Sequence, residues 1–230
     1  MSSRFVWLCS PLRRSLVAAP VATILVFASV GGRTATSASV GGAAVSGSPA
    51  AGYRIDAGQS HFTVHVGVGG LLSGFAHNHN IAIRNFTGNV EFSPDSPKGA
   101  MNMTIEANSL AVIDKVSDKD RQEIEQHMRD EVLETSKYSQ IVFRSTDVSV
   151  NKVGEGQYQA KIFGDLTLHG VTRHGLINAQ LEVNGNTIKA RGEFPLRQTE
   201  YGIKLISVAG GTVKVKDELK FNFDIVANRG

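Results

Sequence analysis

Apolar and polar residues alternate along most of the chain that follows Tyr53. The segment His61–Val68 is typical, since every even position is Phe or Val and every odd position is His, Thr or Gly. A period of two residues predicts β-strands with one buried and one solvated face, because successive side chains of a strand point to opposite sides. The same alternation recurs in residues 81–92, 101–106, 141–150, 158–168, 177–183, 188–197 and 219–225. Gly, Asn, Ser and Pro separate these runs, so the sequence predicts about eight antiparallel strands with one covered face.

One segment breaks the alternation. After Ser117, the apolar residues Ile124, Met128 and Val132 recur at every fourth position, with charged and polar residues between them. This spacing places them on one face of an α-helix, and Ser117 has an acidic residue three positions later, as helix starts often do. We therefore expect a single amphipathic helix over about residues 118–133.

These elements fit one all-β domain, which we place at residues 53–228. The strands could close into a barrel or stack as two sheets, and alternation alone does not separate the two architectures. Closure would remove the exposed strand edges, and an eight-stranded barrel has an interior wide enough for side chains or for one small ligand. The predicted interior positions include Gly and Ala beside large apolar residues, so a cavity is compatible with the sequence.

Residues 1–38 are ordered like a secretory signal. Arg13 and Arg14 precede an uncharged run of 15 residues, Leu16–Val30, and small residues follow as far as Ala38. The apolar run is shorter than the ~20 residues of a membrane-spanning helix, which favours cleavage over anchoring. We expect a signal peptide over residues 1–38 and a periplasmic or secreted protein. The arginine pair leaves a twin-arginine route open, and sites near Ala38 compete for cleavage.

Removal of this segment would change the charge of the chain. Four of the 24 Lys and Arg residues and none of the 21 Asp and Glu residues lie in residues 1–38, so the formal charge of +3 becomes about −1 without them. The basic character therefore does not support a nucleic-acid partner. The single cysteine, Cys9, would leave with the signal, which excludes thiol catalysis and cysteine-bound metal in the remainder. Residues 39–52 are rich in Gly, Ala and Ser, and we expect a flexible leader there.

Three motifs in the same order resemble the YceI-like family. They are Tyr53-Arg54-Ile55-Asp56 followed by Ser60-His61-Phe62-Thr63-Val64, the helix exit His127-Met128-Arg129 leading to residues 137–145 (KYSQIVFRS), and residues 164–172 (GDLTLHGVT). The resemblance covers about Tyr53 to Ala227. It implies a lipocalin-like, eight-stranded antiparallel β-barrel, exported to the periplasm or outside, whose apolar tunnel binds a polyisoprenoid or related long-chain lipid. Arg173-His174 stand where family members commonly have Lys-Pro, a change that should leave the barrel intact.

We expect a binding protein that holds a polyisoprenoid or other long-chain lipid, catalyses nothing and needs no cofactor. No nucleophile elbow, phosphate-binding loop or dinucleotide-binding glycine motif is present in the sequence. Nucleic acid is not an expected partner, and a homodimer is left open.

The residues expected to line the tunnel are the large inward-facing ones: Phe62, Val64, Val66, Met101, Met103, Ile105, Phe143, Ile162, Leu166, Leu168, Phe194, Phe221 and Phe223.

Two of the seven histidines, His77 and His79, are candidates for contact with a lipid head group. They share parity with Ile81, so a strand that begins by Ala76 would point both rings toward the interior, near the barrel mouth. With a third ligand they could instead hold a metal ion. If the strand begins at Ile81, both histidines lie in a solvated loop.

The other histidines fit structural or surface positions. His61 and His65 share the wet face of their strand, His169 and His174 fall on polar positions beside a turn, and His127 lies next to the apolar stripe of the helix.

Two further classes of function stay open at this point. One is a periplasmic metal- or redox-linked protein that uses His77 and His79, and the other is a ligand-free barrel that acts in envelope stress through its surface.

Overall fold

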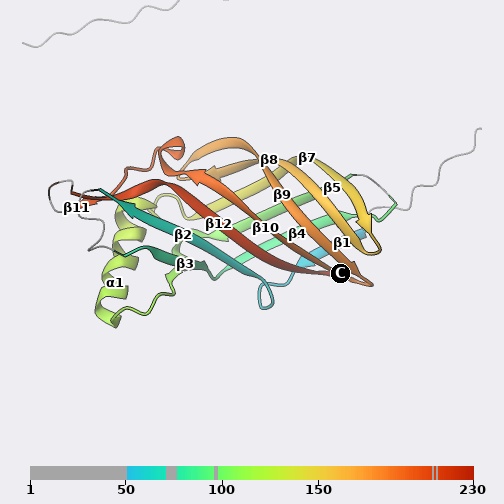
Figure 1. The fold of residues 1–230 in the computed structure, drawn as a ribbon, viewed down its shortest axis with the longest axis horizontal. Coiled ribbons are helices and arrows are strands. Elements are labelled where there is room, and N and C mark those ends of the chain that lie inside the picture. Colours follow the sequence, from blue (N-terminus) through green and yellow to red (C-terminus); the bar gives the residue numbers. More distant parts are fainter. Residues whose placement is uncertain (1–50, 71–76, 96–97, 209, 211) are drawn as a thin grey trace, which may run out of the picture. The chain divides into compact units, whose positions relative to one another are not determined.

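The computed structural model describes residues 51–70, 77–95, 98–208, 210 and 212–230. It is built mainly of antiparallel strands with one α-helix (Figure 1). The strands are β1 (Ala51–Ile55), β2 (His61–Gly69), β3 (His79–Ile83), β4 (Phe86–Phe92), β5 (Gly99–Glu106), β6 (Leu110–Val112), β7 (Gln140–Gly154), β8 (Gln157–Leu168), β9 (Val171–Asn184), β10 (Thr187–Arg197), β11 (Ser207–Val208) and β12 (Val213–Arg229). The helices are α1 (Asp118–His127) and the short turns η2 (Ala107–Ser109), η3 (Met128–Val132) and η4 (Gln198–Tyr201).

Eight strands close a barrel. The ladder runs β1–β4–β5–β7–β8–β9–β10–β12, and the last strand pairs with the first through Tyr53–Arg229 and Ile55–Ala227. Every pairing is antiparallel. This confirms the eight-stranded antiparallel barrel and decides between the barrel and the stacked sheets that alternation left open. β1 begins at Ala51, inside the segment expected as a leader, while residues 1–50, including the expected signal peptide, lie outside the described residues.

One edge of the long strand β12 pairs with two different strands along its length, while its opposite edge pairs with β10 and β11. Its end pairs with β1, and its beginning pairs with β2, from Lys214–Gly69 to Asp224–His61. Between β1 and β2 the chain turns at Ser60, whose hydroxyl accepts from Val226 N (2.9 Å) and donates to Asp56 O (2.7 Å). From β2 the sheet continues to β3 and then to β6, which is the last strand on that path.

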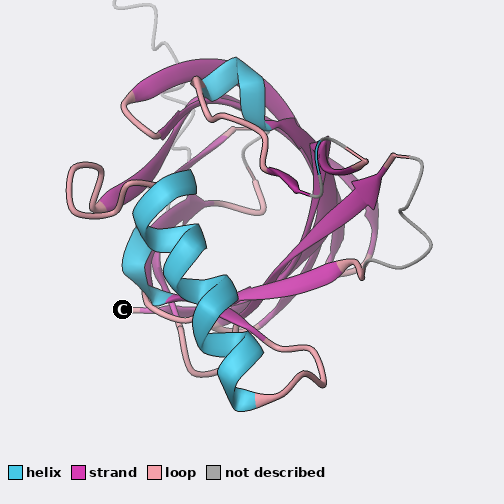
Figure 2. Cartoon of the chain, turned by 90° about the vertical axis from the view of Figure 1, so that its left-hand side faces the viewer, coloured by secondary structure: helices cyan, strands magenta, loops and turns pink. Residues whose placement is uncertain are grey.

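Helix α1 lies against the free edge of β6. Ser117 caps its start by accepting from Asp120 N (3.1 Å), and the helix continues through the wider turn η3. The predicted helix over residues 118–133 is thereby confirmed. Two side chains of α1 satisfy the backbone of the edge strand, because Glu125 accepts from Val112 N (3.0 Å) and Arg121 donates to Val112 O. An unpaired edge would expose these groups, so the helix takes the place of a further strand. Figure 2 looks at this end of the barrel, with α1 across the front.

The interior has two unlike halves. The half that contains β1 is largely filled, with a void of about 50 Å³ beside Phe92. Phe92 is the most deeply buried large side chain, is 2% exposed and packs edge-on against Tyr158 with ring centroids 5.2 Å apart. The half that contains α1 is hollow, and it holds the candidate site described below. No helix in the described part of the chain is both long and apolar enough to cross a membrane.

Candidate functional site

The hollow half of the barrel encloses a cavity of about 1220 Å³. All thirteen residues expected to line a tunnel lie on its wall. They reach it from β2, β5, β7, β8, β10 and β12, because each strand turns one parity inward. The cavity is larger than the 300–1,000 Å³ that is usual for a small-molecule site, so it has room for a long ligand.

Aromatic rings shape the cavity wall. Phe62 packs edge-on against Phe86 at 4.9 Å, and Phe194 stacks on Phe221 at 4.9 Å. Two strand glycines make room for rings: a Cβ on Gly164 would lie 2.4 Å from Cζ of Phe143, and one on Gly192 would lie 2.5 Å from Cζ of Phe223. A larger residue at either glycine would displace a ring of the wall.

The helix supplies part of the wall that the sequence prediction did not assign. The half-buried side chains of Ile124, Met128 and Val132 line the cavity, and they are the apolar stripe from which the helix itself was predicted. Parity could not assign them, since a strand rule does not say which face of a helix meets the barrel. Beside them the helix also places Asp120 and Glu123 on the cavity wall.

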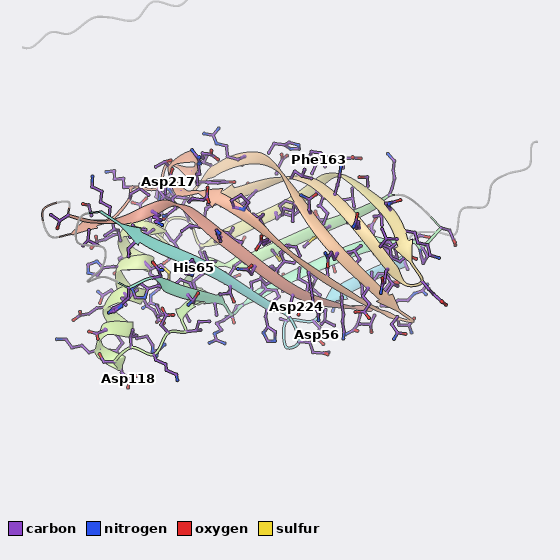
Figure 3. The ribbon with its side chains drawn as sticks, viewed as in Figure 1. Asp56, His65, Asp118, Phe163, Asp217 and Asp224 are labelled. Atoms are coloured by element: carbon purple, nitrogen blue, oxygen red, sulfur yellow. The ribbon has the colours of Figure 1, made fainter. Side chains whose placement is uncertain are left out.

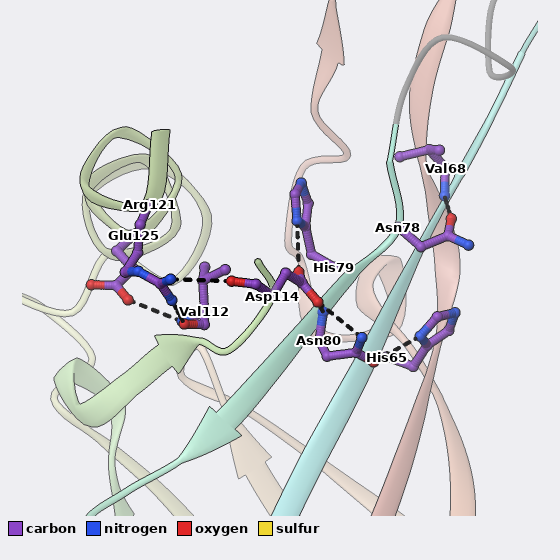
Figure 4. Close-up of polar contacts among 9 residues, drawn as sticks. All are labelled: His65, Val68, Asn78, His79, Asn80, Val112, Asp114, Arg121 and Glu125. Atoms are coloured by element: carbon purple, nitrogen blue, oxygen red, sulfur yellow. Dashed lines mark hydrogen bonds and ion pairs between the residues drawn. The ribbon is translucent and has the colours of Figure 1, made fainter. Parts of the chain in front are cut away.

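The two candidate histidines occupy different positions. β3 begins at His79, between the two starts considered from the sequence, and both His77 and His79 lie on the cavity wall. His77 is exposed, whereas the ring of His79 is 24% exposed and its Nδ1 lies 3.0 Å from Oδ2 of Asp114 (Figure 4). The carboxylate therefore fixes the orientation of the His79 ring.

Asp114 also binds the strand that carries His79. Its carboxylate accepts from the backbone N–H of Asn80 (3.0 Å) and from the Asn80 side chain (2.9 Å), and Asn80 Oδ1 lies 3.1 Å from His65 Nδ1. His65 stands on the outer face of β2, as expected (Figure 3). Because Arg121 donates to Asp114 O (3.1 Å), these contacts connect α1, the loop after β6 and the start of β3.

The Asp114 contacts predict a dependence of stability on pH. Partial burial works to raise the pKa of the Asp114 carboxyl, but the hydrogen bonds from Asn80 and His79 outweigh it and hold the pKa below its ordinary value of 3.8. A carboxylate with a lowered pKa stabilises the fold above its unfolded-state pKa, and that contribution is lost as the pH falls through the folded-state pKa. We expect Asp114→Asn to lower the urea midpoint at neutral pH, with the difference from the parent protein shrinking below pH ~3.8. A difference that stays constant over this range would contradict the assignment.

Within the part of the chain that the structure describes, no group of three or more His, Cys, Asp or Glu side chains is placed to hold a metal ion. Among the described residues, His77 and His79 are therefore not part of a group of three side chains that could bind a metal ion.

Comparison with known proteins matches residues 53–227 to the YceI-like domain. The chain belongs to the YceI-like family. A UPF0312 protein of Photorhabdus laumondii is 30% identical over 181 residues, which is 76% of this chain and 77% of the relative. Protein YceI of Escherichia coli O157:H7 is 31% identical over 175 residues, covering 73% of this chain and 75% of the relative.

Two solved structures share the fold. BcnA of Burkholderia cenocepacia aligns with a TM-score of 0.57 and 20% identity, over 76% of this chain and 99% of that protein. A polyisoprenoid binding domain from Saccharophagus degradans, implicated in plant cell wall breakdown, aligns with a TM-score of 0.56 and 16% identity, over 77% of this chain and 98% of that domain.

The motif GDLTLHGVT of this YceI-like chain forms the end of β8, a hairpin turn and the start of β9, and its Gly164, Leu166 and Leu168 line the cavity. His169 (φ 51°) and Gly170 (φ 74°) are the two turn residues between β8 and β9, and both have the left-handed conformation that tight hairpins require. The sequence placed His169 on a polar position, but its side chain is only 12% exposed. Its Nε2 lies 2.8 Å from Glu134 Oε2, and its ring packs at a tilt of 56° against Tyr138 with ring centroids 4.4 Å apart. His169 therefore ties the hairpin to the end of the helical segment.

Proposed function

We propose that this protein is an exported binding protein that holds a polyisoprenoid or other long-chain lipid in the barrel cavity and catalyses no reaction. The observation that carries the proposal is the 1220 Å³ cavity, whose wall is formed by apolar side chains from most strands and from the helix. The Saccharophagus domain with the same fold is described as polyisoprenoid binding, which agrees with this assignment.

Burial alone would hold such a ligand. Each CH₂ group taken from water contributes about 0.8 kcal/mol, so a dozen buried methylenes contribute roughly 10 kcal/mol. That is enough to offset the cost of ordering a flexible chain in a preformed cavity. Little polar recognition is then needed, which fits a wall whose surface is mostly apolar.

The polar end of the ligand would lie near His79. Asp114 holds Nδ1 of this ring, which leaves Nε2 as the atom that could contact a hydroxyl, carbonyl or phosphate group. His77, which lies at the exposed end of the same wall, would be a second contact. We assign no catalytic role to either histidine.

Export rests on the sequence of residues 1–38, with Arg13 and Arg14 before the apolar run. We propose cleavage near Ala38, followed by a periplasmic or secreted location. Intact-mass measurement of the protein recovered from its own host would give the cleavage position, and recovery of the full chain from the cytoplasm would contradict export.

The lipid proposal predicts a bound molecule in the purified protein. Protein prepared without detergent should show, in native mass spectrometry, one extra mass per chain that disappears after extraction with organic solvent. The extract should contain an isoprenoid or acyl lipid in an amount equal to that of the protein. A ligand-free mass, together with failure to bind added long-chain lipids, would contradict the proposal and favour a barrel that acts through its surface.

A further inference from the structure

The barrel wall contains a lateral slot between β9 and β10. These strands pair from Thr187–Asn184 to Arg191–Gln180, next to their shared turn. Both strands continue beyond that point, β9 back to Val171 and β10 on to Arg197. Within the described residues, no further ladder pair joins the two strands, so residues 171–179 of β9 and residues 192–197 of β10 are not paired with each other.

Both strands remain regular along the slot, because the opposite edge of each one is still paired with a neighbouring strand. β9 remains paired with β8 as far as Leu168–Val171, and β10 remains paired with β12 as far as Arg197–Glu218. At the far end the slot is closed again, because Arg173 Nε donates to Glu200 O (2.9 Å) just after β10 ends. The unpaired region is therefore bounded by β8 and β12 at its sides, by the ladder at one end and by the Arg173–Glu200 hydrogen bond at the other.

A proline limits pairing beyond the end of the ladder. Asn184 and Thr187 flank a two-residue hairpin turn and so form a hydrogen-bonded pair. Every second residue of β10 after Thr187, up to Pro195, then turns its backbone amide toward β9. Pro195 has no N–H to donate, and proline in a strand belongs at an unpaired edge. At residue 195 the sequence therefore removes one ladder hydrogen bond, four residues beyond Arg191, the last residue of β10 that pairs with β9.

The cavity reaches the slot. Most of the wall takes one parity from each strand, but here runs of four consecutive residues of both strands, residues 173–176 and 194–197, line the cavity. Gly175 has no side chain to fill the gap, and no atom lies within 4 Å of the position that its Cβ would take. Leu176, on the outer rim, is 41% exposed. Leu176 therefore belongs both to the outer surface and to the cavity wall.

We propose that this slot is the portal through which the long-chain ligand passes sideways between the cavity and its donor or acceptor. The inference rests on the proposed function. A lateral opening lets a chain slide in along its length without displacing α1, which the Arg121 and Glu125 contacts hold on β6. The charged residues Arg173, Glu193 and Arg197 along the open edges oppose pairing with a strand of another protein, which favours a portal over strand docking.

The test closes the slot reversibly. In a Cys9→Ser background, Leu176→Cys with Arg197→Cys places one thiol on each side of the slot and keeps Pro195, and a reducible bis-maleimide bridges the two thiols. The matched control, Glu182→Cys with Lys189→Cys, joins the same two strands where they are already paired and where both residues are exposed. Uptake and release of dansylamino-undecanoic acid are followed by fluorescence before and after reduction of the bridge.

We expect the bridged slot variant to take up and release the probe at least about tenfold more slowly than after reduction, with little change in final occupancy, because the bridge raises a barrier and leaves the cavity intact. The bridged control should show no such difference. Equal rates with the slot bridged and open would overturn the portal while leaving lipid binding in place. Absence of probe binding to the parent protein would overturn the proposed function and the portal with it.

A second measurement covers the case in which the double variant does not fold. Leu176→Cys alone, modified with a polymer-bearing maleimide, should slow probe uptake, whereas Glu182→Cys with the same adduct should not. Equal uptake by the two adducts would also overturn the portal.

Discussion

Replacing Phe92 by alanine is expected to lower the free energy of unfolding by about 3–5 kcal/mol, the usual cost of truncating a buried aromatic residue. Phe92 is 2% exposed, packs against Tyr158 and lies in the filled half of the barrel, so the surrounding side chains have little room to close over the gap. For a domain of this size the loss corresponds to a fall in melting temperature of roughly 10 °C. Urea denaturation of the ligand-free protein measures the change directly.

The matched control is Phe194→Ala in the hollow half. Phe194 is half-buried and borders the cavity, so its truncation removes fewer contacts and should cost about 1–2 kcal/mol. Lipid binding should show the opposite order, with a larger loss for Phe194→Ala than for Phe92→Ala. Equal destabilisation by the two substitutions would contradict the division of the interior into a filled and a hollow half.

The cavity wall was predictable because strand parity is a local property. Once Phe62, Val64 and Val66 alternate with polar residues, their common face follows from backbone geometry alone. The helix was predictable for the same reason, from the spacing of Ile124, Met128 and Val132. Barrel closure was not, because the Tyr53–Arg229 pair joins residues from opposite ends of the domain and no local pattern encodes that pairing.

The remaining features of the site depend on long-range contacts or on backbone conformation. Asp114 lies 35 residues from His79 in the sequence, and only the β3–β6 pairing brings them together. His169 was assigned by parity to a polar position, but its left-handed φ takes it out of the strand pattern and turns its ring onto Tyr138. Pro195 lies within a regular strand pattern but has no N–H for a ladder hydrogen bond, which indicates an unpaired edge at the slot. The alternation of apolar and polar residues does not by itself reveal that edge.

Filling the cavity without touching the slot should remove lipid binding while leaving the fold intact. Met103 lies on β5, three strands along the ladder from β9, and its half-buried side chain borders the cavity. Met103→Trp would place an indole in space that the ligand needs. If it excludes about three methylene groups at about 0.8 kcal/mol each, affinity for a long chain should fall roughly fiftyfold.

The neighbouring residue Asn102 provides the control for Met103→Trp, since it is exposed and points to the outer face of the same strand. Asn102→Trp should bind lipid like the parent protein, with both variants keeping a cooperative urea transition. Titration with lipids of graded length gives a sharper result, because a partly filled cavity should still accept short chains and reject long ones. If Met103→Trp bound long and short chains as well as Asn102→Trp does, the ligand would not occupy this cavity, and the outer surface would become the place to look for its binding site.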